Sequence, residues 1–448
     1  NLNGKSNDGR LTYSTNFSGN YSKSNQATSL GTGGVNQNYV LGALKGAPYL
    51  NPNDYNGSHP SIWTPLTTAN TFLTGDLLKA SPFLLMDKAK WFEFNQEELK
   101  MIAQGNINYK LTDDLSIGTS LGVDYTHITQ NTYDSPYSFN SWYFSPERNN
   151  PEVFVGYEGQ INQRTVSFNS LTNLKWNKVF NDKHEVKAGV FLEYLKAHFK
   201  SAGLTQNGLD MYLSQPNTGA GWISDLDTND YYVPNVSMGT ATSGLFSYFA
   251  NASYDYDTRY GVEATVRRDA SFRFANSNRW GTFYSVSARW NISNEEFMQE
   301  SVFDELKLRG SYGTAGNQDI TGSGLFGGAS LFRDLYSVGG GYNNNPSLVI
   351  SNIANPFLKW ETVNQANIGV DFGLWQNRLR GTVDVYQKTT NDLYQSQPIS
   401  AIYGISSIFA NIGSMRNRGV EVLLSGDVVR NDNFRFTLTA NGSYNQNR

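Results

Sequence analysis

Residues 246–256 read FSYFANASYDY, and every second residue of this stretch is apolar or aromatic. The apolar set runs from Phe246 to Tyr256, and it alternates with mostly small or polar residues such as Ser247 and Asp255. Successive side chains of a β-strand point to opposite faces of a sheet. Alternation with a period of two therefore predicts a strand with one apolar face and one polar face.

Three further stretches repeat this alternation, at about residues 260–267, 280–292 and 306–312. No charged side chain lies in the middle of the apolar set. The polar set of these strands carries Asp255, Glu263, Arg267, Arg289, Lys307 and Arg309. A lysine or arginine that faces lipid at mid-bilayer costs roughly 2–4 kcal/mol, whereas a water-filled lumen tolerates charge. The placement of the charges therefore favours a membrane barrel.

We predict an all-β, antiparallel transmembrane β-barrel. The charged residues expected to face its lumen are Glu263, Arg267, Arg289, Lys307 and Arg309. The residues expected to face lipid are Phe246, Tyr248, Tyr254, Val262, Trp280, Val286, Trp290, Ile368, Val370 and Phe372. Aromatic residues also gather near the strand ends, as they do in the interfacial girdles of such barrels.

Composition allows this architecture without requiring it. The 448 residues include 42 glycines, 14% aromatic and 17% charged residues, a mixture that suits strands and polar loops. The net charge of −4 gives no electrostatic argument for a nucleic-acid partner. Because cysteine is absent, disulfides and thiolate metal sites are excluded. No run of 18 or more apolar residues occurs, but barrel strands are nearly invisible to hydropathy.

The alternating pattern recurs along the whole chain and predicts about thirteen strands. Short turns rich in Asn and Asp join many of them, and long irregular connections are expected at about residues 22–98, 128–163 and 199–240. Outer-membrane barrels have short periplasmic turns and long extracellular loops. An odd number of strands leaves a free edge, and the chain begins without Met or an apolar signal segment. We therefore expect residues 1–448 to be part of a longer barrel protein.

A soluble β-sandwich is the main alternative, because the core face of its strands would also alternate. It explains the strands but neither the two classes of loop length nor the placement of aromatics. A β-solenoid is disfavoured because no fixed repeat period appears.

Motifs for catalysis are absent. The four histidines, His59, His127, His184 and His198, show no spacing typical of metal ligands, and no nucleophile elbow or phosphate-binding loop occurs. The cluster Asp225, Asp227, Asn229 and Asp230 could offer oxygen ligands to calcium. It lacks the glycine and the terminal glutamate of a calcium loop, so a solvated loop is favoured. We predict no enzymatic activity, no cofactor and no metal.

A long connection carries six aromatic residues, Tyr133, Tyr137, Phe139, Trp142, Tyr143 and Phe144. Exposed aromatics bind sugar rings or peptide side chains, or they dock a partner protein. Tyr133, Tyr137, Trp142, Tyr143 and Phe144 are accordingly candidates for contact with a ligand or a partner. Packing of the loop on itself or on the barrel rim is an equally good interpretation.

Residues 267–295, RRDASFRFANSNRWGTFYSVSARWNISNE, resemble the SusC/RagA family of TonB-dependent outer-membrane importers. The similarity continues in LKLRGSYGTAGNQDI at residues 306–320 and in LKWETVNQANIGVDFG at residues 358–373. Two further segments, at residues 378–394 and 411–427, follow in the same order.

The resemblance implies a barrel of about 22 strands filled by a plug, in the cell outer membrane. It also implies a SusD-like lipoprotein lid, energy from the TonB complex, and import of oligosaccharides or peptides. No plug, no N-terminal extension and no closing strand are recognisable here, so the function belongs to the parent protein. A structural or adaptor barrel in a cell-surface or secretion assembly, and a soluble lectin-like protein, are the alternatives. The sequence does not distinguish glycan from peptide as substrate.

Overall fold

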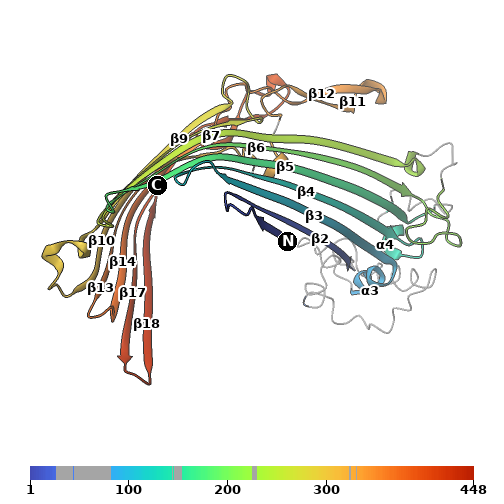
Figure 1. Cartoon of the computed structure of the whole chain (residues 1–448). Coiled ribbons are helices and arrows are strands. Elements are labelled where there is room, and N and C mark those ends of the chain that lie inside the picture. The colour runs from blue at the N-terminus through green and yellow to red at the C-terminus, as the bar shows by residue number, and fades with distance from the viewer. Residues whose placement is uncertain are drawn as a thin grey trace.

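The computed structural model describes residues 1–26, 82–143, 154–223, 230–321, 324–328 and 330–448, together with residues 44 and 145. Fourteen strands form a single antiparallel sheet in which neighbours follow one another along the chain. The sheet is strongly curved and open, with β1 and β18 at its edges (Figure 1). Its strands are β1 (Leu2–Lys5), β2 (Leu11–Gln26), β3 (Phe92–Lys110), β4 (Leu115–Asp134), β5 (Tyr157–Phe180), β6 (His184–Asn207), β7 (Asn235–Tyr256), β8 (Tyr260–Ser271), β9 (Trp280–Asn291), β10 (Phe303–Asn317), β13 (Glu361–Leu374), β14 (Leu379–Asn391), β17 (Ser414–Arg430) and β18 (Arg435–Asn447).

All thirteen strands predicted from the alternation are present, and the sheet contains one more. The additional strand is β1, whose four residues LNGK pair with β2 through the register Leu2↔Thr15 to Lys5↔Thr12. A segment with a single large apolar residue is too short to show a period of two, so sequence alone does not reveal it.

Several strands continue far into stretches that the sequence predicted to be irregular. Strand β3 begins at Phe92, β4 continues to Asp134, β5 begins at Tyr157 and β6 continues to Asn207. The limits predicted for the long connections at 22–98, 128–163 and 199–240 were therefore wrong. These extensions carry polar residues on both faces, so the alternation that marks the rest of each strand fades there although the backbone pairing continues.

The short turns are tight, with three residues between the closing pairs Phe180↔His184 and Tyr256↔Tyr260. Asn181 and Asp182 have φ values of 51° and 56°, and Asp257 and Thr258 have values of 50° and 57°. Positive φ at both central positions matches the right-handed twist of the paired strands. Because the strands are antiparallel neighbours, all such turns lie at one end of the sheet.

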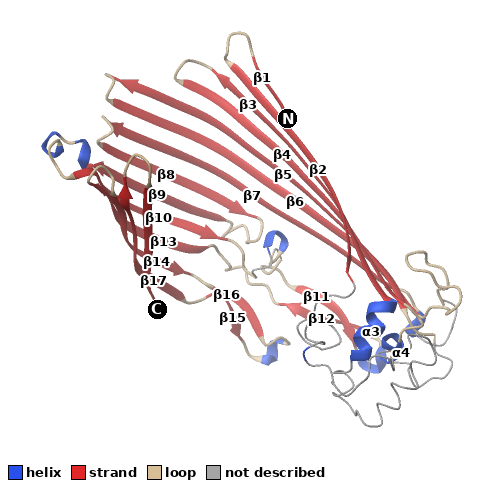
Figure 2. Cartoon of the chain, turned by 90° about the horizontal axis from the view of Figure 1, so that it is seen from below, coloured by secondary structure: helices blue, strands red, loops and turns tan. Residues whose placement is uncertain are grey.

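The longer connections lie at the opposite end and hold most of the other secondary structure (Figure 2), while the short helices η5 (Ile292–Asn294) and η6 (Glu296–Met298) lie in the link from β9 to β10 at the short-turn end. The elements in the longer connections include the helices α3 (Pro82–Trp91) and α4 (Phe139–Tyr143) and the hairpins β11 (Leu335–Gly340) with β12 (Pro346–Asn352) and β15 (Tyr394–Pro398) with β16 (Ser407–Asn411). A small hydrophobic core at this end consists of Phe274, Phe283, Ile320, Leu358 and Trp360. Among the described residues, no helix has both the length and the apolar character that crossing a membrane requires.

The apolar face of the sheet has no second layer over it. Tyr248, Val262 and Val286 are 43%, 48% and 46% exposed, values that the core of a sandwich does not reach. On β13, the Ile368 side chain is also exposed, at 64%. In a soluble domain this face would be covered by another layer. The soluble β-sandwich is therefore wrong for the described part of the chain, and the strands form a single-layered barrel wall.

Candidate functional site: a charged wall on the polar face

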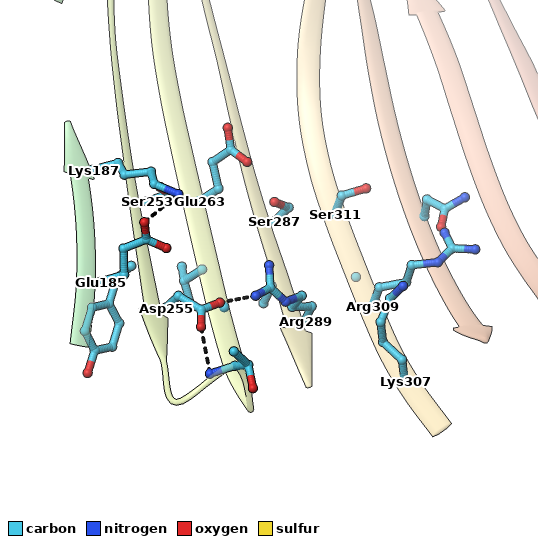
Figure 3. A pocket seen from close by; sticks show the side chains of 17 residues that line it. Glu185, Lys187, Ser253, Asp255, Glu263, Ser287, Arg289, Lys307, Arg309 and Ser311 are labelled. Atoms are coloured by element: carbon cyan, nitrogen blue, oxygen red, sulfur yellow. Dashed lines mark hydrogen bonds and ion pairs between the residues drawn. The ribbon is translucent and has the colours of Figure 1, made fainter. Parts of the chain in front are cut away.

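The polar face of β6–β10 carries a cavity of about 500 Å³ near the short turns (Figure 3). Four of the five residues predicted to face the lumen line it, namely Glu263, Arg289, Lys307 and Arg309. The fifth, Arg267, lies further along β8 on the same face. We call these five residues and the acids that pair with them the charged wall.

Arg289 reaches its acidic partner across an intervening strand. In the register of the sheet, Asp255 of β7, Gly261 of β8 and Arg289 of β9 lie in one row. The Arg289 guanidinium donates to the Asp255 carboxylate (Figure 3). A Cβ atom on Gly261 would lie 3.0 Å from the Arg289 side chain. The glycine thus leaves the space over which the arginine crosses β8.

Arg309 repeats this arrangement on the next three strands of the sheet. Arg309 of β10, Gly369 of β13 and Asp384 of β14 form one row, and Arg309 Nη2 lies 2.6 Å from Asp384 Oδ2. A Cβ atom on Gly369 would come within 2.6 Å of both Arg309 and Asp384. Asp371 completes the group, 2.7 Å from Lys307 Nζ and 3.2 Å from Arg309 Nε. Both basic residues are therefore held by carboxylates.

Arg267 anchors a second part of the wall that combines charge with aromatic rings. Its guanidinium donates to Glu193 at 2.5 Å and to Asp269 at 2.6 Å, and it lies 4.8 Å from the centre of the Phe249 ring. Phe249 stacks on Phe191 with ring centres 4.5 Å apart and planes 3° from parallel. Sequence reasoning overlooked this aromatic pair, because a long connection joins β6 to β7 and the register of Phe249 with Phe191 follows only from the folded sheet.

Glu263 differs from the basic members of the wall. It lies in register between Ser253 of β7 and Ser287 of β9 and lines the cavity. No ion pair joins Glu263 to another residue in the described part of the chain. Its carboxylate is thus available to a group that enters the cavity.

The charged wall suits binding of polar groups better than catalysis. Its arginines and lysine are engaged by carboxylates, and the described residues contain no group of three or more His, Asp and Glu side chains that could hold a metal. His184 shares a hydrogen bond with the Tyr254 hydroxyl at 2.8 Å, and His198 with that of Thr242 at 3.2 Å. His59 and the acidic cluster at residues 225–229 lie outside the described residues, as does the side chain of Asp230.

The loop aromatics lie where the long connections meet the ends of β3 and β4. Tyr133 is 6% exposed and shares a hydrogen bond with Ser214 Oγ at 3.1 Å. Tyr137 stacks on Trp91 with ring centres 5.4 Å apart, and Trp142 is half-buried in α4. Phe144 and the side chain of Tyr143 lie outside the described residues. Packing against neighbouring connections, at Ser214 and at Trp91 of α3, accounts for Tyr133 and Tyr137. Contact with a ligand or partner stays a prediction.

A buried polar cluster fixes α3 to the segment that follows β4. Asp87 is fully buried and accepts hydrogen bonds from Ser138 Oγ and from Asn140 Nδ2, both at 2.8 Å. Burial raises the pKa of neighbouring Asp134, at the loop end of β4, to about 7. Sequence reasoning missed Asp87 because it lies in a stretch without alternation, far along the chain from its partners.

A family model described as "TonB dependent receptor-like, beta-barrel" matches residues 1–448. TonB-dependent receptor P39 of Formosa agariphila is 33% identical over 350 residues, which cover 76% of this chain and 30% of that protein. TonB-dependent receptor SusC of Bacteroides thetaiotaomicron is 28% identical over 362 residues, covering 76% and 32%. The chain thus spans about a third of the length of these curated relatives.

The chain also resembles solved structures in its fold. The chain matches a structure of the RagAB peptide transporter with a TM-score of 0.80 and 25% identity, over 99% of this chain and 46% of that one. A structure of the RagAB peptide importer in the "open-open" state gives a TM-score of 0.77 and 26% identity, over 99% and 45%.

Proposed function

Because the chain belongs to the TonB-dependent receptor β-barrel family, of the SusC/RagA-like outer-membrane transporters, we propose that its parent protein imports oligosaccharides or peptides. In this proposal TonB supplies the energy and a SusD-like lipoprotein forms the lid. Solved relatives are named as a peptide transporter and a peptide importer, which supports the peptide branch of the proposal.

The observation that carries the proposal is the division of the sheet into two faces. Charged residues of five neighbouring strands share one face and line a common cavity, while the opposite face exposes apolar side chains such as Val262 and Val286. A barrel wall that separates lipid from a water-filled lumen needs this division. We therefore assign Glu263, Arg289 and the rest of the charged wall to the lumen.

We further propose that the chain contributes consecutive strands to a longer barrel whose plug and remaining strands lie outside it. The unpaired edges of β1 and β18 support this, because a closed barrel has no free edge. The share of the relatives that the chain covers supports it too. Contact with TonB would then involve segments outside this chain.

The loop aromatics have a place in the same proposal. Tyr137 and Trp142 are only half-buried, and they lie at the end of the sheet opposite the short turns. In an outer-membrane barrel this end is extracellular. We propose that this region, with Tyr133 as its buried support, contacts the ligand or the lid.

Isolation of the full-length receptor from native membranes tests the import function. We expect a lipoprotein of the SusD-like class to co-purify, and mass spectrometry of the extracted complex to detect bound oligosaccharide or peptide. A large, stable protein assembly that contains neither lid nor ligand would contradict import and favour the adaptor barrel.

A further inference from the structure

Five basic side chains gather on the apolar face of β4, β5 and β6, where the apolar part of these strands ends. We call them the basic patch: His127, Arg164, Lys196, His198 and Lys200. The register places His127 directly opposite Arg164, and Arg164 directly opposite Lys200. His198 and Lys196 follow on β6 at the next two positions of the same face.

The basic patch lacks compensation by acids. Like charges directly opposite one another on adjacent strands are destabilising. No carboxylate among the described residues forms an ion pair with Arg164, Lys196 or Lys200. Glu97, on the same face of β3, forms its ion pair with Lys23 instead, at 3.0 Å. The arginines of the charged wall, by contrast, are all paired. A bound anion would relieve the repulsion in the patch.

The height of the patch matches the boundary of a bilayer. On β4 the apolar face runs from Leu115 to Tyr125, interrupted only by Thr119, before His127 begins the patch. That stretch is roughly 33 Å long along the strand. A strand tilted by about 40° would then cross an apolar layer of about 25 Å, the height of the lipid-facing band in such barrels. The patch therefore begins where outer-leaflet headgroups lie.

The same boundary is visible on β6 and β8. On β6 the apolar face ends at Tyr194 and Lys196 follows at the next position. On β8 Arg268 follows Val266; its guanidinium lies 5.2 Å from the centre of the Trp280 ring and donates to the Tyr248 hydroxyl at 3.3 Å. Aromatic rings followed by cations are typical of the interface between lipid and water.

A groove on the same face lies within the apolar band and reaches the opposite end of that band, where Leu115 and Trp176 line it. It has a volume of about 670 Å³ and a floor of small side chains, Ala188, Ala250, Ala252 and Ala264. On β6 only Leu192 and Tyr194 of this face separate the groove at Val190 from Lys196. A hydrocarbon chain that runs down from Lys196 past Tyr194 and Leu192 would enter this groove.

We propose that the basic patch binds the phosphorylated headgroup of an outer-leaflet lipid, with one acyl chain in the alanine-floored groove. Arg164 supplies the planar fork that matches a phosphate, and Lys196 and Lys200 supply point charges beside it. A free phosphate would use only the cations, whereas a lipid uses the cations and the groove together. The inference rests on the proposed function, because it needs the apolar face to contact lipid.

Titration of the purified full-length receptor with bis-phosphorylated lipid A tests this site, with dephosphorylated lipid A and inorganic phosphate as parallel probes. The variant R164Q/K200Q removes two charges from the patch. The control K110Q/K175Q removes two charges from the polar face, where both lysines lie opposite Ser116 of β4. We expect R164Q/K200Q to weaken binding of phosphorylated lipid A roughly tenfold or more, and the control to retain it.

Three results would overturn the proposal. The two variants could lose affinity equally, the wild-type receptor could bind both forms of lipid A equally, or inorganic phosphate could bind as tightly as the lipid. A failure of the proposed function itself would appear elsewhere. It would show as a Val286 side chain that faces water and a Ser287 side chain that faces lipid, whatever the result of the lipid titration.

Discussion

At the scale of single residues, the charged wall depends on positions that carry no charge. Gly261 and Gly369 are the points where an arginine side chain crosses a strand to reach its carboxylate. A side chain at either position would occupy that path. The ion pairs of the wall are therefore specified as much by the glycines between the partners as by the partners themselves.

Replacement of Gly369 by alanine should break the contact between Arg309 and Asp384. The new Cβ would lie 2.6 Å from both side chains, so the guanidinium has to move. We expect destabilisation on the order of 1 kcal/mol, since the partly exposed pair is screened by water. Urea unfolding of the receptor refolded into lipid vesicles measures the change.

Gly310→Ala on the neighbouring strand is the control, because its Cβ would meet only the Asn367 carbonyl at 3.9 Å. We expect that variant to be neutral or slightly stabilising. In a double-mutant cycle, G369A should cost little once Asp384→Asn is present. An undiminished cost in the D384N background would contradict the crossing arrangement.

Asp134 makes the order of the loop end sensitive to pH. Burial raises the pKa of this carboxyl from its usual 3.8 to about 7. The folded loop therefore binds a proton that the unfolded chain has already released, and stability falls as pH rises between about 4 and 7. Below this window and above it, Asp134 contributes no slope.

Asp134→Asn should remove that slope and should order the loop end more firmly at pH 8 than the wild-type residue does. Hydrogen exchange of residues 133–141 at pH 5 and pH 8 measures the effect. The buried neighbour Asp87, which accepts hydrogen bonds from Ser138 and Asn140, is retained in both proteins. An equal pH dependence in D134N and wild type would assign the slope to another group.

At the scale of elements, the sequence predicts a strand well where its two faces meet different surroundings. In β7, Tyr248 lies on the exposed apolar face, whereas Ser247, the residue before it, lies on the polar face and is buried. Beyond the apolar band both faces carry polar residues, so the extensions of β3 to β6 leave no periodic signal. Asp87 of α3 and its partners Ser138 and Asn140 also lie in stretches without alternation, and their contacts follow from tertiary structure alone.

The charged wall shows the same limit. Alternation places Glu263, Arg289 and Arg309 on one face, as predicted, but it does not give the register between strands. The pairing of Arg289 with Asp255 across β8 requires that register. Hairpin turns such as Asp257–Thr258 fix it locally, whereas the long connections do not.

The two faces of β9 should respond differently to charge. Lysine at Val286 would place an ammonium on the apolar face and should cost roughly 2–4 kcal/mol, with a clear loss of assembled receptor in the membrane. Lysine at Ser287, the next residue of the same strand, lies on the polar face beside the cavity and should assemble normally. Heat-modifiable mobility on gels and the yield in outer-membrane fractions compare the two.

At the scale of the whole molecule, the described residues form a single-layered sheet of fourteen strands with one apolar face and one polar face. The polar face pairs the arginines and the lysine of the charged wall with acids and carries a cavity, and the apolar face ends in the basic patch. The proposed lipid contact and the proposed lumen charge both depend on one assignment: apolar side chains point to lipid and the charged wall to water.

Spin labels placed singly along β9 test that assignment most directly. The chain contains no cysteine, so labels at positions 284 to 288 of the full-length receptor report on this wall without competition from within it. We predict that labels at Tyr284, Val286 and Ala288 collide with oxygen dissolved in the bilayer, and that labels at Ser285 and Ser287 collide with an aqueous nickel complex. Equal accessibility at all five positions, or the opposite phase, would contradict the account.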